Sequence, residues 1–330
     1  MSKVTVSIED IRQKSMQCLL AHGAEQWVAE EMANAISYAE SRHNPICGLY
    51  YLDSYCAHLR NGRVNGSAEP HVSQPKASAV HIDAKDGFAQ PAFKKGITQA
   101  IAIAKENGTC SLAISDAYTP TAIGYFTDQI AAAGLMGIGF ANAPACVAPP
   151  GGSSAVLGTN PIAMSVPARD GGVAFHFDQS TTVVIIGKIR VAAAAGEKIP
   201  THWAVDKHGA PTDDPNAALD GGSLAFAGEH KGYGISLMVE LLAAAVTGSL
   251  SSTKAPPLKA AEGPAHGLGQ FFFLLDPTTF SGEAFFDQLE ALMQTVESQP
   301  NARLPGESQI ETEIALDSAL WDKVNTLAQG

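Results

Sequence analysis

The sequence predicts an α/β or α+β body in which strands and helices alternate. Between residues 79 and 142, three β-leaning stretches are separated by two segments with helical periodicity. A strand–helix–strand order of this kind builds a sheet covered by helices. The 330 residues are 45% hydrophobic and 16% charged, which is typical of a globular enzyme large enough to bury a sizeable core.

Helices are expected in the first sixty residues. Ser7 is a plausible N-cap, apolar side chains follow it at helical spacing, and His22-Gly23 closes the first helix. A second helix is expected from near Gln26 to residue 40. A third is expected over residues 50–61, because Gly62 follows it.

The middle of the chain predicts the sheet. Strands are expected at residues 79–83, 110–114 and 137–142, with helices over 88–106 and 124–134. Another helix is expected over residues 235–246. The polar, proline-rich segment 249–264 predicts a mobile surface loop.

Charge and cysteine content exclude several classes of protein. The net charge of −12 argues against nucleic acid or an anionic membrane as the main partner, since both require a basic surface. No window approaches the ~20 apolar residues of a membrane span, and the start has no signal-peptide pattern. The five cysteines form no C-x-x-C pair, which favours reduced thiols and a cytoplasmic location. No residues have metal-ligand spacing, so we expect no metal.

A Rossmann dinucleotide site is not predicted. The G-x-G-x-x-G pattern between a strand and a helix is absent, because Gly137-Ile138-Gly139 lacks the third glycine and lies in an expected strand.

Three other segments predict ligand-binding backbone. Gly158-Thr159-Asn160-Pro161 follows a Pro/Gly-rich stretch, and its amides and the Thr159 hydroxyl are suited to a ligand. An ordinary tight turn would have the same composition. In the second segment, 228–234, Lys231 lies at the start of a helix, where phosphate is favoured. The third segment is Arg303-Leu304-Pro305-Gly306-Glu307.

These three segments, in this order, resemble the malate/L-lactate dehydrogenase family of the second type, over residues 7–325. Residues 87–91 and 205–215 are most similar to its piperideine-2-carboxylate and pyrroline-2-carboxylate reductase branch. The resemblance implies a non-Rossmann NAD(P)-binding α/β fold with a mostly antiparallel sheet and a helical N- and C-terminal domain. It also implies a homodimer. The expected parts are a helical segment 1–75, a cofactor- and substrate-binding body 76–250, and a segment 251–330 that packs back on the first.

The resemblance further implies a reductase that uses NADP or NAD, with NADPH favoured, on a small-molecule substrate. Asp178 matches the aspartate that pairs with the family's catalytic histidine. The cofactor contacts that it implies are Pro120, Thr121, Ala122, Ile123, Asp178, Gln179, Ser180, His230, Lys231, Gly306 and Glu307.

The chain departs from the family at the residues that carry the chemistry. The family's Ser-His-Gly motif corresponds here to Ile46-Cys47-Gly48, and the arginine that clamps a substrate carboxylate corresponds to Tyr51. A second family histidine is absent from Asp116-Ala117-Tyr118-Thr119-Pro120. Tyr51 and Thr159 are the candidate substrate contacts.

The missing histidine leaves the proton donor open. Cys47 and His43 are the leading candidates, beside Tyr50 and Tyr51, although Cys47 is equally consistent with an inert thiol and His43 with a surface residue. A cyclic imine that arrives protonated needs hydride more than an acid, so the loss would cost less than for a ketone. Asp178 is equally consistent with a strand-end cap.

The function that this sequence favours is NAD(P)H-dependent reduction of a cyclic imine or a related C=N or C=O substrate. Two alternatives stay open. The first is a diverged member that binds a nucleotide or a cyclic amino-acid-like ligand without hydride transfer. The second is a 2-hydroxy-acid dehydrogenase, which the missing histidine and arginine disfavour.

Overall fold

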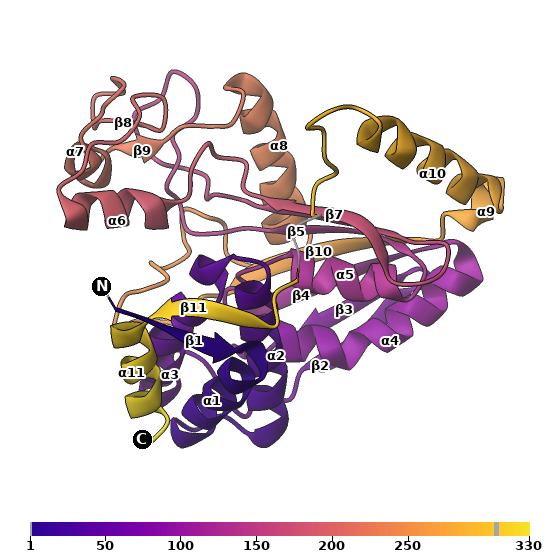
Figure 1. Cartoon of the computed structure of the whole chain (residues 1–330), viewed down its shortest axis with the longest axis horizontal. Coiled ribbons are helices and arrows are strands. Elements are labelled where there is room, and N and C mark those ends of the chain that lie inside the picture. Colours follow the sequence, from indigo (N-terminus) through magenta and orange to yellow (C-terminus); the bar gives the residue numbers. More distant parts are fainter. Residues whose placement is uncertain (1, 307–309) are drawn as a thin grey trace.

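A mixed seven-stranded sheet forms the centre of the computed structural model, which describes residues 2–306 and 310–330 (Figure 1). β3 and β4 run parallel, and the other neighbouring strands run antiparallel. The expected mostly antiparallel, non-Rossmann sheet is therefore confirmed. In spatial order the strands are β2 (His71–Lys76), β3 (Ala79–Asp83), β4 (Thr109–Ala117), β10 (Leu268–Leu275), β5 (Met136–Ala141), β6 (Ile162–Pro167) and β7 (Val173–Gln179).

Two helices, α4 (Ala89–Asn107) and α5 (Gly124–Ala132), cover one face of the sheet. α4 connects the parallel strands β3 and β4, which is the strand–helix–strand unit that the sequence predicts. Alternate strand residues such as Ile82, Ile114 and Phe272 are completely buried against Phe93 and its neighbours. This alternation fixes the register, since a slip by one residue would turn every apolar side chain to the other face.

α8 (His230–Glu240) and a π-helical turn (Leu241–Ala245) pack on the opposite face, against Phe140 and Phe271. The helix begins at His230, earlier than the expected residue 235. Gly232 explains the difference, because a Cβ there would lie 2.2 Å from the carbonyl oxygen of Ala227. That glycine therefore permits close packing inside the helix and does not interrupt it.

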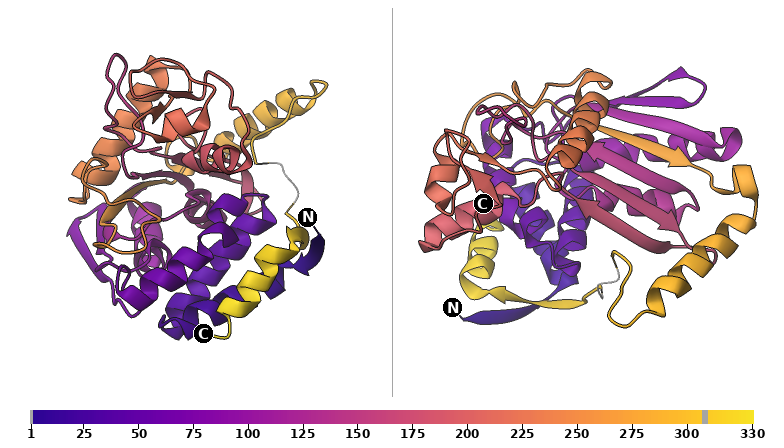
Figure 2. Two further views of the ribbon diagram at one scale, coloured as in Figure 1. Left: turned by 90° about the vertical axis from the view of Figure 1, so that its left-hand side faces the viewer. Right: turned by 90° about the horizontal axis from the view of Figure 1, so that it is seen from above.

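The two ends of the chain form a second layer (Figure 2, left). β1 (Lys3–Ser7) pairs antiparallel with β11 (Glu313–Asp317), and α11 (Ser318–Leu327) packs on α1 (Ile8–Ala21) and α3 (Leu52–Asn61). The Ser7 hydroxyl accepts a hydrogen bond from the Asp10 amide at 3.0 Å, which confirms the N-cap. α2 (Gln26–Ser41) is followed by the short 3-10 turns Pro45–Cys47 and Leu49–Tyr51.

A smaller unit stands above the helical layer in Figure 1. It consists of α6 (Ile186–Ala195), α7 (Pro215–Leu219) and the short pair β8 (Ala204–Val205) and β9 (Ser223–Leu224). Its own apolar cluster includes Val147, Ile189 and Phe226. At the other end of the sheet, α9 (Thr278–Ser281) and α10 (Ala284–Glu297) project outward (Figure 2, right).

β10 comes from the segment after residue 250 and lies between β4 and β5, in the middle of the sheet. The segment before it is attached to the body by Arg63, whose guanidinium donates hydrogen bonds to the carbonyl oxygens of Pro257, Ala260 and Pro264. No helix in the described part of the chain combines the length and the apolar character needed to cross a membrane.

Candidate active site

Two cavities meet at the carboxyl end of β7, where both are lined by Asp178 and Gln179. The larger has a volume of about 700 Å³ and the smaller about 560 Å³. Cavities of this size suit a small ligand or part of a dinucleotide.

The larger cavity brings together segments that are far apart in the sequence. The 3-10 turns contribute Cys47 and Tyr51, and Thr159 lies in the Gly/Pro-rich loop. The residues after β4, the start of α6 and the segment 252–258 complete the wall. Of the predicted site residues, those that line it are Cys47, Tyr51, Pro120, Thr121, Thr159, Asp178, Gln179 and Ser180.

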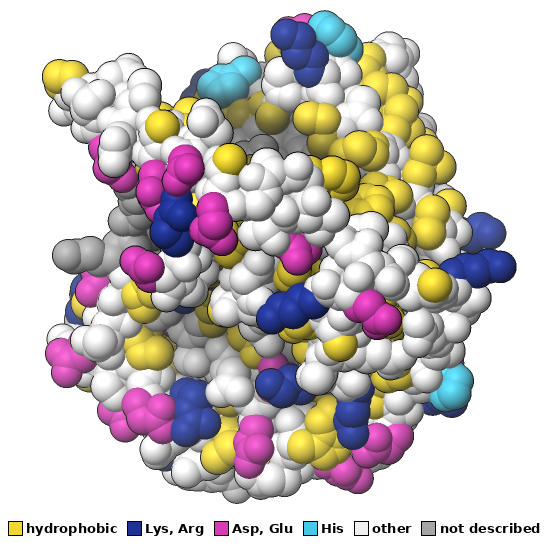
Figure 3. Space-filling model, turned by 90° about the vertical axis from the view of Figure 1, so that its right-hand side faces the viewer, with side chains coloured by type: hydrophobic (Ala, Val, Ile, Leu, Met, Phe, Trp, Pro, Cys, Tyr) yellow, Lys and Arg dark blue, Asp and Glu magenta, His cyan; other side chains and the backbone are white. Residues whose placement is uncertain are grey.

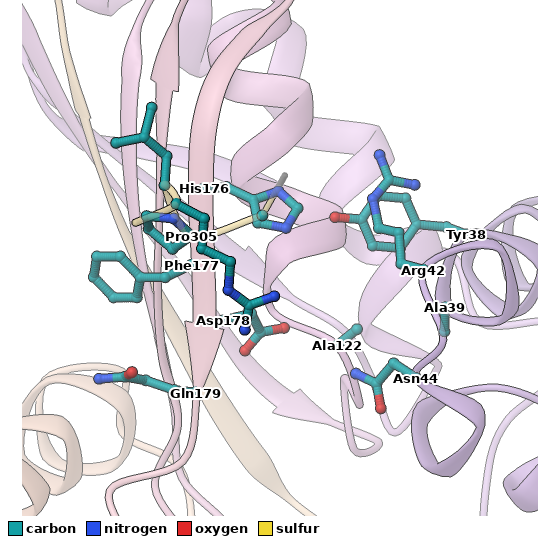
Figure 4. Close-up of a pocket in the computed structure, with 13 residues that line it drawn as sticks. Tyr38, Ala39, Arg42, Asn44, Ala122, His176, Phe177, Asp178, Gln179 and Pro305 are labelled. Atoms are coloured by element: carbon teal, nitrogen blue, oxygen red, sulfur yellow. The ribbon is translucent and has the colours of Figure 1, made fainter. Parts of the chain in front are cut away.

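The smaller cavity lies between α2, β7 and the segment 303–306 (Figure 4). Tyr38 and Arg42 project from α2, and His176 and Asp178 from β7, with His176 and Tyr38 pointing toward each other (Figure 4). The predicted residues Ala122 and Gly306 also line this cavity, whereas Ile123 is fully buried behind it. Glu307 lies outside the described residues.

Asp178 is held at the start of α5. The backbone amide of Gly124 donates a hydrogen bond to its Oδ2 at 2.9 Å, and the helix N-terminus favours a negative charge there. Its side chain is open to the cavities, yet the surrounding protein removes enough bulk water to raise the pKa of Asp178 to about 6. It therefore exchanges a proton near neutral pH.

The Cys47 and Tyr51 side chains are neutral at physiological pH. Burial, followed by the nearby Asp178 charge, raises the pKa of the Cys47 thiol to about 12. Burial also raises the pKa of Tyr51 to about 12. Both groups hold their protons strongly, so neither is tuned to release one during turnover at neutral pH.

His43 lines neither cavity. Its side chain is 61% exposed, and its Nε2 lies 3.3 Å from Glu311 Oε1. His230 and Lys231 are likewise exposed at the start of α8, away from both cavities of their own chain.

A hydrogen-bonded group centred on Asp128 supports the smaller cavity. Asp128 accepts hydrogen bonds at 2.7 Å from Tyr38, Ser165 and His176 Nδ1. Burial by itself would raise the pKa of Asp128, but these hydrogen bonds outweigh it and the pKa is lowered. Asp128 is therefore a charged group that fixes the His176 ring and leaves Nε2 as its second polar atom.

Sequence reasoning missed His176, Arg42 and Arg190 at these cavities. For His176 a signal was present, because residues i and i+2 of a strand share a face and Asp178 was already a candidate. For Arg42 and Arg190 the local sequence contains no corresponding signal. No group of three or more His, Cys, Asp or Glu side chains within residues 2–306 and 310–330 is placed to hold a metal ion.

Comparison with known proteins agrees over the full length of the chain. The family model described as malate/L-lactate dehydrogenase matches residues 6–324. The chain is 37% identical over 301 residues to (2R)-3-sulfolactate dehydrogenase (NADP(+)) of Chromohalobacter salexigens, covering 91% of this chain and 89% of the relative. It is 35% identical to Delta(1)-pyrroline-2-carboxylate reductase of Ancylobacter novellus, covering 98% and 97%.

A solved structure also matches the fold. Delta1-piperideine-2-carboxylate reductase from Pseudomonas syringae pvar. tomato superposes with a TM-score of 0.89 at 30% identity, over 98% of this chain and 99% of that one.

Proposed function

The chain belongs to the malate/L-lactate dehydrogenase family, and we propose that within it this protein reduces the C=N bond of a cyclic imine that carries a carboxylate. It is an NAD(P)-dependent oxidoreductase of the type represented by its pyrroline-2-carboxylate reductase relatives.

The observation that carries this proposal is the neutral wall formed by Cys47 and Tyr51. Reduction of a ketone needs a proton on oxygen as hydride arrives, and a positioned acid supplies it. The raised pKa values of Cys47 and Tyr51 make both groups poor acids at neutral pH. A cyclic iminium ion already carries its proton on nitrogen, so the cavity needs only to bind and orient it and to exclude water.

The smaller cavity supports binding of the cofactor's phosphate groups. Arg42, His176 and Arg303 give it three basic side chains. Gly306 has a φ of +81°, and a Cβ there would lie 2.6 Å from the His176 carbonyl oxygen, so glycine keeps the backbone close to this wall. These groups suit a nicotinamide dinucleotide, which supplies hydride when bound. The several cations favour NADPH over NADH, because NADPH carries one more phosphate.

We also propose a homodimer in the cytoplasm. α8 and the π-helical turn expose Ile235, Met238 and Leu241 at 42%, 41% and 60%, and a band of hydrophobic side chains crosses one face of the molecule (Figure 3). An apolar surface of this kind marks protein contacts. The five free cysteines support a reducing compartment.

The deciding experiment incubates the protein with NADPH or NADH and a panel of substrates, and follows the absorbance of the reduced cofactor. We expect turnover of Δ1-piperideine-2-carboxylate and Δ1-pyrroline-2-carboxylate, with kcat/KM at least about 100-fold above pyruvate and oxaloacetate, given the size of the missing acid contribution. Faster reduction of the 2-oxo acids would support a 2-hydroxy-acid dehydrogenase instead. Cofactor binding without any turnover would support a non-redox role.

A further inference from the structure

The larger cavity contains one cationic side chain among its described lining residues. That residue is Arg190 on α6, and the one carboxylate in the same lining is Asp178. The other lining groups are apolar side chains, hydroxyls, amides and thiols, which carry no charge at neutral pH.

The start of α6 is fixed against the cavity wall from two directions. Ile189 is completely buried in the apolar cluster of the small unit, and Gly187 faces Ile46, whose side chain would lie 3.6 Å from a Cβ at position 187. Arg190 follows on the same helix and reaches the cavity from the side of α6. Its guanidinium forms no hydrogen bond or ion pair with any described residue.

The positive charge of Arg190 acts on groups around the same cavity. It opposes the burial that raises the pKa of Tyr51 and of Cys146, both of which line the cavity. An arginine that influences both side chains without a carboxylate partner is available for an anionic ligand.

A second cation reinforces this charge behind the tyrosines. The Lys259 Nζ donates a hydrogen bond to the Tyr50 carbonyl oxygen at 3.1 Å and lies 3.3 Å from the centre of the Tyr50 ring. Burial, followed by repulsion from Arg190, lowers the pKa of Lys259 to about 8. Asp53 is the acid that opposes this shift, and it forms an ion pair with Lys323 at 2.7 Å.

We propose that Arg190 binds the carboxylate of the substrate, in the role that the family resemblance gives to an arginine at position 51. The planar guanidinium suits two parallel hydrogen bonds to a carboxylate, and Tyr51 is then left to pack against the ring of the substrate. The assignment rests on the proposed function for the identity of the substrate. It rests on the cavity alone for the presence of an anion site.

The test uses Arg190→Met and Arg190→Lys in the full-length protein, with Lys188→Met as the matched control. Lys188 is exposed on the same helix and lines neither cavity. Calorimetry with pyrrole-2-carboxylate, an unreactive planar analogue, measures anion binding in the presence of NADP⁺. Steady-state kinetics compare Δ1-piperideine-2-carboxylate with 2-methyl-1-pyrroline, a cyclic imine that has no carboxylate.

We expect Arg190→Met to raise the Kd of the analogue and the KM of the imine carboxylate roughly 10- to 100-fold, the usual loss for hydrogen bonds to a charged group. Arg190→Lys should recover part of this loss. Lys188→Met should leave both constants unchanged, as should Arg190→Met for the neutral imine and for NADPH affinity. Thermal unfolding checks that the variants are folded.

An unchanged Kd for the analogue in Arg190→Met would overturn the assignment, even with full reductase activity in the unsubstituted protein. Failure of that protein to bind the analogue would overturn it as well. Failure to reduce any imine, with analogue binding that still depends on Arg190, would instead overturn the proposed function and leave the anion site in place.

Discussion

Glu240 on α8 accepts a hydrogen bond from the side-chain amide of Asn160 at 2.9 Å, which attaches the Gly/Pro-rich loop to the helix beneath it. The same carboxylate accepts two more hydrogen bonds from Ser252, from its amide at 2.7 Å and from its hydroxyl at 2.5 Å. Thr159 and Ser252 both line the larger cavity. One acidic side chain therefore positions two walls of the candidate active site.

We predict that Glu240→Ala destabilises the protein by on the order of 2 kcal/mol, because it leaves the Asn160 amide and the Ser252 amide without their acceptor. Urea denaturation measures the change. The control Glu297→Ala removes an exposed carboxylate at the end of α10 and should change stability by less than about 0.5 kcal/mol. Equal stability of the two variants would contradict a positioning role for Glu240.

Asp178 makes stability depend on pH. Its pKa is about 6 in the folded protein, against an ordinary value of 3.8, so the folded state binds the proton more tightly than the unfolded state. Its contribution to stability is complete below its ordinary pKa and is lost as the pH rises through about 6. Asp178→Asn cannot titrate and lacks this dependence.

The measurement is urea denaturation of both proteins at several pH values from about 4 to 7.5. We expect the unfolding free energy of the unsubstituted protein, relative to Asp178→Asn, to fall across this range. Water in the cavities screens the charge and limits the size of the effect. A constant difference would mean that the pKa of Asp178 is not raised.

We predict that Cys47→His together with Tyr51→Arg increases activity on 2-oxo acids. The double variant supplies an acid and a carboxylate clamp in the larger cavity, and a positioned acid contributes about 10²–10⁴-fold in typical enzymes. The measurement is kcat/KM for pyruvate and oxaloacetate. No gain in a folded variant that binds cofactor would mean that other parts of the cavity exclude these substrates.

Single substitutions test which group donates the proton in the unsubstituted protein. We expect Cys47→Ala and His43→Ala each to lower turnover of a cyclic imine by less than ~10-fold, because a protonated imine needs no acid and His43 lines neither cavity. A loss of roughly 10²-fold at either position, together with a rate that falls as the pH rises, would identify that residue as the donor.

Lys231→Ala is predicted to weaken cofactor binding roughly 5- to 10-fold with little change in kcat, since it removes one cation from a phosphate. Lys231 is exposed and lines neither cavity of its own chain, so this effect requires a second subunit to bring it to the site. Calorimetry with NADPH measures it, with exposed Lys105 on α4 as the control position. Equal affinities in Lys231→Ala and Lys105→Ala would argue against that contribution.

Local patterns in the sequence determined the elements of this protein and its family. Helical spacing, the Ser7 cap and the alternation in β3 involve neighbours within a few residues, so they are visible without a structure. The Gly158–Ala163 and Arg303–Gly306 segments were visible for a similar reason, because backbone that needs glycine or proline constrains its own sequence. These segments were sufficient to identify the family and to place Cys47, Tyr51, Thr159 and Asp178 among the site candidates.

Only the tertiary structure decided which side chains share a cavity. The pairing of β1 with β11 joins residues more than 300 positions apart, and β10 enters the sheet between strands that precede it by more than 100. Arg190 lies in an alanine-rich helix with no local sign of function, and packing of α6 against Ile46 brings it to the same wall as Tyr51. Such contacts depend on how apolar faces far apart in the chain bury one another, and no short-range pattern records that choice.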